Sequence, residues 1–175
     1  MSEREDATAA GASAAAPGPD PTGTDKDGPI PDEATPGKVS PDAFAAGTRN
    51  RRRVLGDAYV DRSWAAAQAT PFLHPLQEAV TGLAWGAIWD RPGLDLKTRS
   101  LVTVSVLIAT NRRHELALHL RGALNVGWTR EELQEIFLHA GCYCGWPAAV
   151  DAHRVAAEVF AELEAAGQTP GEAAR

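Results

Sequence analysis

From residue 41 onward, apolar residues recur at the three- and four-residue spacing that places them on one face of an α-helix. Ser40 and Pro41 are typical of a helix start, because serine can cap the first free amide groups and proline fits the first turn. The pattern predicts three helices in this half, over residues 41–55, 57–69 and 71–90. The apolar face of the third is expected to contain Leu76, Val80, Leu83, Ala84 and Ile88.

The second half contains one segment whose secondary structure is ambiguous. Residues 102–108 are rich in valine, isoleucine and threonine, which favour a buried β-strand. Length favours a helix, because the uninterrupted segment from Asp95 to Asn111 exceeds a usual strand and the chain offers no partner strand. Three further helices are expected over residues 112–125, 129–145 and 147–163. The sequence therefore predicts an all-α fold of about six to seven helices.

Composition divides the chain at about residue 40. Residues 1–40 hold half of the twelve prolines and few residues that could form a core, so we expect them to be disordered. Disorder is also expected over residues 166–175, which leaves one helical domain over residues 41–165. Residues 1–40 also contain eight of the 23 acidic residues but three of the 17 Lys and Arg, so the helical domain is nearly neutral.

A nearly neutral domain argues against nucleic-acid binding, which needs a clustered positive field. We interpret the one basic run, residues 49–53, as a solvated helix start that pairs with nearby acids. No apolar stretch reaches the roughly 20 residues that span a bilayer, and the N-terminus lacks the apolar part of a signal peptide. Cys142 and Cys144 are too close for a relaxed disulfide, which fits a reducing compartment. We therefore expect a cytoplasmic protein without nucleic-acid or membrane partners.

Residues 111–121 form the densest polar cluster in otherwise apolar surroundings. On a helix, Arg112, Glu115 and His119 share one face, whereas His114 points elsewhere. A carboxylate one turn before an imidazole can hydrogen-bond the imidazole and raise its pKa, which suits a proton donor near neutral pH. The alternative is an exposed helix face with an ordinary Arg–Glu–His pairing, and composition by itself favours that alternative.

Two other reactive residue types have the wrong spacing for their usual chemistry. Zinc is disfavoured, because the H-E-x-x-H arrangement places its histidines four residues apart, whereas His114 and His119 are five apart. Cys142 and Cys144 lack the C-x-x-C spacing of a catalytic dithiol and fall late in a helix. We expect them to be buried structural thiols.

Three further residues could belong either to the core or to a site. His139 is expected to be buried, as a satisfied core histidine or as part of a catalytic group. Trp85 and Trp89, four residues apart, form an aromatic stripe that is typical of a core but could also wall a small cavity.

Specific motifs then extend through the second half of the chain. The motifs are His-Glu-Leu followed by His119, Arg121-Gly122-Ala123 with Asn125, Thr129-x-Glu131-Glu132, and Tyr143-Cys144-Gly145-x-Pro147-Ala148-Ala149. Together with the upstream segment RRRVLGDAYVDRS, they resemble the 4-carboxymuconolactone decarboxylase family, and the resemblance covers residues 44–159. The resemblance implies an alkylhydroperoxidase D-like all-α fold, no cofactor, and self-association, usually as a ring-like homohexamer. In related peroxidases a C-x-x-C-x-x-x-H motif would fall on Arg112, Glu115 and His119, so both thiols of that chemistry are absent here.

The reaction implied by the resemblance is the decarboxylation of γ-carboxymuconolactone to β-ketoadipate enol-lactone in the breakdown of aromatic compounds. On this hypothesis His119, oriented by Glu115, delivers a proton, and His114 holds the oxyanion or shares in proton transfer. Arg112 and Arg121 are the candidates for binding the substrate carboxylates, because a guanidinium can grip a carboxylate through two hydrogen bonds. The remaining candidates for substrate binding are Trp85 and His139.

Three rival functions remain open at the level of sequence. The first is an enzyme of the same scaffold that acts on another lactone or β-keto acid. The second is an oligomeric binding module in which the His-Glu-His segment is only an interface. The third is a redox role that depends on Cys142 and Cys144.

Overall fold

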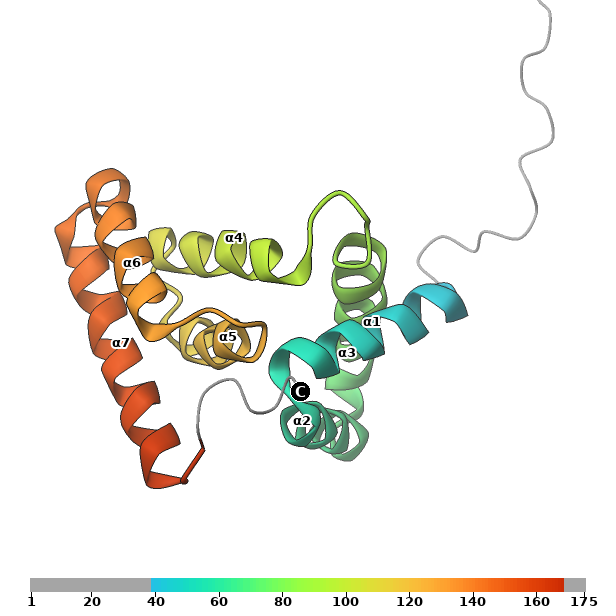
Figure 1. The fold of residues 1–175 in the computed structure, drawn as a ribbon. Coiled ribbons are helices and arrows are strands. Elements are labelled where there is room, and N and C mark those ends of the chain that lie inside the picture. Colours follow the sequence, from blue (N-terminus) through green and yellow to red (C-terminus); the bar gives the residue numbers. More distant parts are fainter. Residues whose placement is uncertain (1–38, 169–175) are drawn as a thin grey trace, which may run out of the picture. The chain divides into compact units, whose positions relative to one another are not determined.

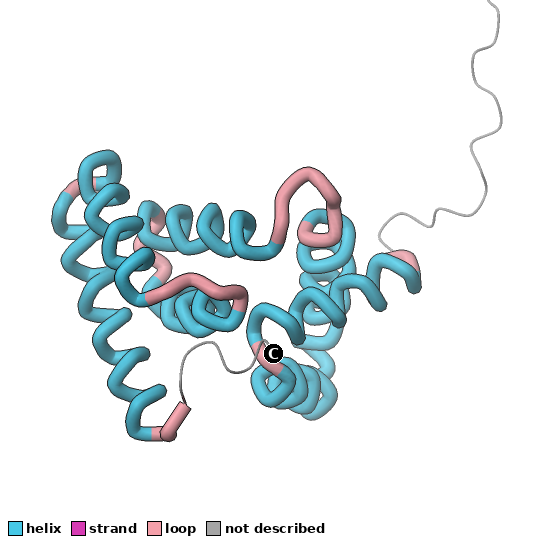
Figure 2. The backbone as a smooth tube through the Cα atoms, viewed as in Figure 1, coloured by secondary structure: helices cyan, strands magenta, loops and turns pink. Residues whose placement is uncertain are grey.

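The computed structural model describes residues 39–168, and every regular element in this range is helical (Figures 1 and 2). The ambiguous segment around residues 102–108 is helical, so the expected all-α fold is confirmed. The expectations of disorder concern residues that lie almost entirely outside the described range. The elements are α1 (Pro41–Leu55), α2 (Asp57–Ala69), η1 (Pro71–Leu73), α3 (His74–Ala79), η2 (Val80–Ile88), α4 (Leu96–Ala109), α5 (Arg113–Asn125), α6 (Arg130–Cys144) and α7 (Trp146–Ala165).

The helices begin where capping side chains are available. Ser40 Oγ accepts a hydrogen bond from the Ala43 amide at 3.2 Å, and Asp95 Oδ1 accepts one from the Thr98 amide at 2.7 Å. At the start of α6, Thr129 and Glu132 each bond the other's backbone amide in a reciprocal capping box. These contacts satisfy amide groups that have no partner within the helix, and they confirm the predicted starts of α1, α4 and α6.

The larger apolar core lies among α4, α5, α6 and α7, which pack against one another in Figure 1. Leu120 of α5 and Phe137 of α6 are almost completely buried within it, together with Val104 of α4 and Val155 of α7. A smaller cluster joins Val54, Leu55 and Trp85 between α1, η2 and α5. Within residues 39–168, no helix combines the length and the apolar character needed to cross a membrane.

Helices α1 and η2 make the most extensive contact in the fold, and they approach closely enough for their backbones to touch. A methyl group added at Gly47 of α1 would overlap the carbonyl oxygen of Thr81, and one added at Gly86 of η2 would overlap the carbonyl oxygen of Ala43. Glycine is therefore required at both positions, because any side chain would push the helices apart.

The prediction of one regular helix over residues 71–90 was wrong in its geometry. The segment begins as a short 3-10 turn, continues as α-helix, and widens from Val80 to Ile88 into a π-helix, in which bonds such as Trp89 N to Ala84 O span five residues. The wider turn changes which residues point inward, so Leu83 and Ile88 are exposed, and Leu76 of the preceding α3 is exposed as well. The buried residues of η2 are Thr81, Gly82, Trp85 and Gly86.

Arg51 of α1 joins four elements from a buried position, with 3% of its surface exposed. Its guanidinium donates to Gln77 Oε1 at 2.7 Å, to Thr81 Oγ1 at 3.1 Å and to Ser63 Oγ at 3.0 Å. These acceptors are neutral, and burial lowers the pKa of Arg51 more than the nearby Tyr59 raises it. The interpretation of the basic run as fully solvated was therefore wrong for Arg51, although Arg52 does pair with Asp57 and Asp61 on the surface.

We predict that Gly86→Ala destabilises the protein by about 1–3 kcal/mol or more, because the added methyl group meets backbone that cannot move without separating α1 from η2. Gly93→Ala is the matched control, since a methyl group there meets no atom within 4 Å. Urea unfolding of the two variants and the wild type measures the difference. Equal stability of both variants would contradict the close backbone contact.

Candidate functional site

His119 lies on α5, on the side that faces η2. The core face of α5 consists of Leu116, Leu120, Ala123 and Leu124, and this anchors the helix against its neighbours. His119 precedes Leu120, so the turn of the helix carries its imidazole to the edge of that core. There the ring stacks on Trp85 of η2, with 6.0 Å between ring centroids and 5° between ring planes.

Trp85 contacts two other rings. Its other neighbour is Trp89, at 4.3 Å between centroids, and only 5% of the Trp85 residue surface is exposed. Asn50 of α1 holds this end of η2 through its amide nitrogen, which donates to Trp85 O at 3.2 Å and to Asp90 Oδ1 at 3.0 Å. The alternative of core or cavity wall is thus resolved for Trp85, which is a core residue that supports His119.

Burial controls the electrostatics of His119. It lowers the pKa of His119 to about 4, and the negative charge of Glu115 opposes this shift without overcoming it. Glu115 does raise the pKa of His119, as expected, but the net pKa is lowered. The reason is that the loss of hydration outweighs the attraction to an exposed carboxylate. His119 is a neutral imidazole at pH 7, and its buried Nδ1 has no hydrogen-bond partner among the described residues.

The other predicted residues at the start of α5 face solvent. His114 and Glu115 are exposed in the first turn, and Arg112 is exposed at the N-cap position. Arg112 has a backbone φ of −97° and ψ of 73°, and its carbonyl oxygen accepts a hydrogen bond from the Leu116 amide of α5 at 2.8 Å. Its predicted place on one helical stripe with Glu115 and His119 stays a prediction. The bend here includes Asn111 in the left-handed region, at φ 53°, a conformation that asparagine tolerates.

Arg121 and Arg113 of α5 both form ion pairs with acidic residues of α7. Arg121 forms an ion pair with Glu162 of α7, and Arg113 forms one with Asp151 of α7 at 2.9 Å. The structure therefore gives Arg121 a role in holding α5 to α7 within the chain. Arg112 forms no ion pair with any residue from 39 to 168.

Three residues expected to be buried are exposed instead. His139 lies on α6 with its ring 5.1 Å from that of Tyr143, and it belongs to a different part of the fold from the stacked rings of η2 and α5. Cys142 and Cys144 are free, exposed thiols near the end of α6. The expected burial was wrong in each case, because this part of α6 turns these side chains away from the core formed by Phe137 and Ala140.

A cleft of about 750 Å³ is lined by Trp89 and does not include His119. Residues from three places line it: the second half of α1, the connection from η2 to α4, and the turn between α5 and α6. The sequence analysis did not predict this cleft. Its polar residues include Asn50, Arg53, Asp90, Arg91 and Lys97.

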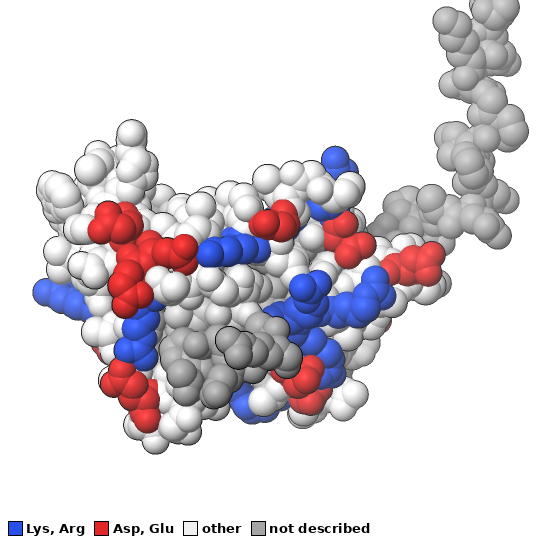
Figure 3. Space-filling view, viewed as in Figure 1, with Lys and Arg blue, Asp and Glu red and all other residues white. Residues whose placement is uncertain are grey.

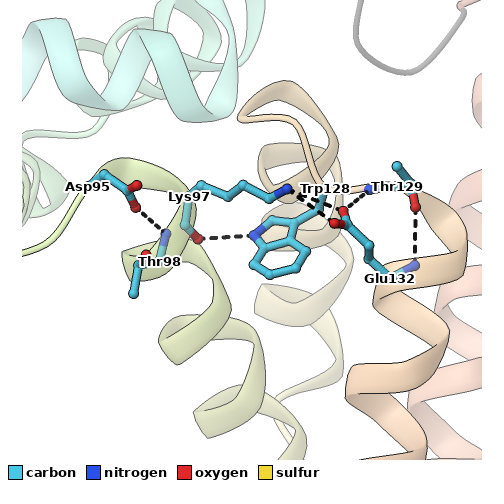
Figure 4. A network of polar contacts seen from close by, with 6 residues as sticks. All are labelled: Asp95, Lys97, Thr98, Trp128, Thr129 and Glu132. Carbon is cyan, nitrogen blue, oxygen red and sulfur yellow. Dashed lines mark hydrogen bonds and ion pairs between the residues drawn. The ribbon is translucent and has the colours of Figure 1, made fainter.

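A polar network fixes one rim of the cleft (Figure 4). Trp128 Nε1 donates to the carbonyl oxygen of Lys97 at 3.0 Å, and the Lys97 ammonium lies 4.3 Å from the centre of the Trp128 ring. The same ammonium is 3.3 Å from both carboxylate oxygens of Glu132. The network ties the start of α4 to the start of α6, so the turn between α5 and α6 is held in place.

The residues present also bear on metal binding. Among residues 39–168, no three or more His, Cys, Asp or Glu side chains converge as a possible set of metal ligands.

Comparisons with known proteins show which family the chain resembles. The sequence model of the carboxymuconolactone decarboxylase family matches residues 74–158. The chain is 41% identical over 136 residues to the nitrosuccinic acid decarboxylase of Metarhizium robertsii, covering 78% of this chain and 94% of that protein. It is 42% identical over 120 residues to the 4-carboxymuconolactone decarboxylase of Acinetobacter baylyi, covering 69% of this chain and 88% of that protein.

We predict that His119→Phe weakens the dependence of stability on acid. In the wild type the folded pKa lies below the ordinary value of 6.5, so stability is lost as the pH falls from 6.5 towards 4. The loss from this one group is on the order of 3 kcal/mol. Phenylalanine keeps a ring against Trp85 but cannot titrate.

Urea unfolding at pH 7 and pH 4 tests this prediction. His114→Phe is the control, because it replaces an exposed histidine and leaves His119 in place, and it should retain the acid dependence of the wild type. An unchanged acid dependence in His119→Phe would show that the buried imidazole is not its source.

Proposed function

The chain belongs to the carboxymuconolactone decarboxylase family and is a carboxy-lyase, and we propose that it converts γ-carboxymuconolactone to β-ketoadipate enol-lactone and CO2. The single observation that carries this proposal is the His119 imidazole, which is buried against Trp85 with a ring nitrogen that has no partner in the described part of the chain. An imidazole in this state can hydrogen-bond a ligand without first releasing a protein group. The similarity to the 4-carboxymuconolactone decarboxylase supports the choice of substrate.

The substrate supplies its own electron sink. When CO2 leaves the γ-carbon, the electron pair flows through the ring double bond to the lactone carbonyl, and a proton then adds to the α-carbon. The protein needs to stabilise the oxyanion, bind the acetate side chain, keep water from the departing carboxylate and supply the proton. None of these steps requires a bound cofactor.

Nitrosuccinic acid is a second candidate substrate, because the similarity to the nitrosuccinic acid decarboxylase extends over more of this chain. The two molecules share the reacting centre. In each, one carbon carries the departing carboxylate and a CH2COO− group, and an electron-withdrawing group receives the electron pair. That group is the conjugated lactone carbonyl in one molecule and the nitro group in the other. The proton then adds to the α-carbon of the lactone but to the carbon that lost CO2 in nitrosuccinic acid. One hydrogen-bond donor can therefore serve both reactions, whereas the proton donor has to reach a different carbon in each.

The geometry favours a particular division of roles among the site residues. As a neutral imidazole, His119 donates a hydrogen bond to the developing oxyanion and is a poor proton source. Proton delivery then falls to His114, with Glu115 beside it, because both are exposed and can exchange protons with water. Arg112 binds a substrate carboxylate, while Arg121 remains paired with Glu162.

Self-association is part of the proposal. Helix α4 is apolar on two sides: Val104 and Ile108 face the core, whereas Val102 and Val106 are 51% and 53% exposed. A helix that is apolar nearly all round is typical of a buried position, so a second copy covering the outer side would remove this surface from water. We propose a homohexamer of the ring type, located in the cytoplasm, where the free thiols of Cys142 and Cys144 stay reduced.

We predict that the purified protein releases CO2 from γ-carboxymuconolactone, and that His119→Phe lowers kcat by about 10²–10³ while remaining folded. Loss of one oxyanion donor accounts for this magnitude. CO2 release from γ-carboxymuconolactone and from nitrosuccinic acid, measured side by side, shows which substrate has the higher kcat/KM. Arg62→Ala, an exposed change on α2, is the control and should keep full activity. Undiminished turnover in folded His119→Phe would rule out the assigned role.

We predict that Val106→Glu disrupts the oligomer, because it places a charge in the middle of the exposed apolar face of α4. Sedimentation velocity should show the wild type as a hexamer and the variant as smaller species. Ala161→Glu, on the exposed side of α7, introduces the same charge away from α4 and should leave the assembly intact. A wild type that sediments as a monomer would contradict the proposed assembly.

A further inference from the structure

The cleft beside Trp89 is lined by three basic side chains, Arg53, Arg91 and Lys97, and by two acidic ones, Asp90 and Asp95. Asp95 accepts a hydrogen bond from the Thr98 amide at 2.7 Å, and Asp90 accepts one from the Asn50 amide nitrogen at 3.0 Å. Lys97 is held between Glu132 and the Trp128 ring. Asp90, Asp95 and Lys97 thus each have a partner within the chain, and the two remaining charged groups of the cleft are the guanidinium groups of Arg53 and Arg91.

Arg53 and Arg91 are unpaired within the described part of the chain. Neither guanidinium forms an ion pair with another residue in the range 39–168, whereas the adjacent Arg52 binds two aspartates. Lys and Arg side chains also gather over α1 on the face shown in Figure 3. Two free guanidinium groups lining one cleft are suited to a carboxylate, which each can grip through two hydrogen bonds.

The wall of the cleft is aromatic. Trp89 is half-buried, and its ring is backed by Trp85 at 4.3 Å between centroids, so it presents a rigid surface to the cleft. Flat, conjugated molecules stack on such a ring more favourably than saturated ones of similar size. Asn50, which is 7% exposed, holds the backbone on both sides of Trp89, because its amide nitrogen donates to Trp85 O and to the Asp90 carboxylate.

We propose that this cleft binds a small aromatic carboxylate, with its carboxylate on Arg53 and Arg91 and its ring on Trp89. The site is separate from the one at His119, because His119 does not line the cleft. The proposal does not depend on the decarboxylation assigned above. A ligand in the cleft contacts a tryptophan that is stacked on a second tryptophan, so binding changes the intrinsic fluorescence.

Titration of the full chain with benzoate tests the proposal, with calorimetry and tryptophan fluorescence as readouts. We expect saturable binding that weakens roughly tenfold or more in Arg53→Ala and in Arg91→Ala, as for the loss of a charge-assisted hydrogen bond. Arg62→Ala is the matched control, since it removes an exposed arginine of α2 that does not line the cleft, and it should bind like the wild type. Cyclohexanecarboxylate, which has the same charge but no flat ring, should bind more weakly than benzoate.

His119→Phe separates this site from the decarboxylation site and should bind benzoate like the wild type. Loss of benzoate binding in His119→Phe, with binding kept in both cleft variants, would place the ligand at His119 and overturn the proposal. So would the absence of saturable binding, or equal affinity for benzoate and cyclohexanecarboxylate. A loss of decarboxylase activity in His119→Phe has no bearing on this outcome, so the two proposals can fail independently.

Discussion

The direct contact between the backbones of α1 and η2 positions most of the groups discussed above. Gly47 and Gly86 leave room for carbonyl oxygens of the opposite helix, so the two helices lie closer than side chains would allow. At this separation Asn50 reaches Trp85 O, and the guanidinium of Arg51 reaches Thr81. The wider turn of η2 then directs Trp85 towards α5 rather than towards solvent. The stack on His119 therefore depends on glycines that have no chemical role of their own.

Burial is the means by which the fold sets the chemistry of His119. The imidazole has lost most of its hydration against Trp85, and a single exposed carboxylate does not replace it. The result is a neutral ring with an unused nitrogen in a poorly hydrated place. This suits an oxyanion donor, because hydrogen bonds to developing charge are stronger where water is excluded. The exposed His114 and Glu115 at the start of the same helix lie where protons from water can reach them.

The similarity to two decarboxylases with different substrates has a simple chemical explanation. The substrates for which the two relatives are named each hold the electron pair left by CO2 on a group of their own. On the proposed mechanism the protein therefore supplies positioning and a hydrogen-bond donor rather than a reaction-specific group. A scaffold of this kind can change substrate by changing the walls of its pocket.

The sequence by itself determined the helical fold and its boundaries, because caps such as Ser40, Asp95 and Thr129 act on the nearest turn of backbone. It also indicated His119 as a candidate, through motifs that need no tertiary information. It could not determine the faces of residues 80–88, the exposure of His139 and Cys142, or the pairing of Arg121 with Glu162. Each of these depends on which helix packs against which. Only the tertiary structure decided the protonation state of His119, because hydration is lost to residues far away in sequence, Trp85 above all.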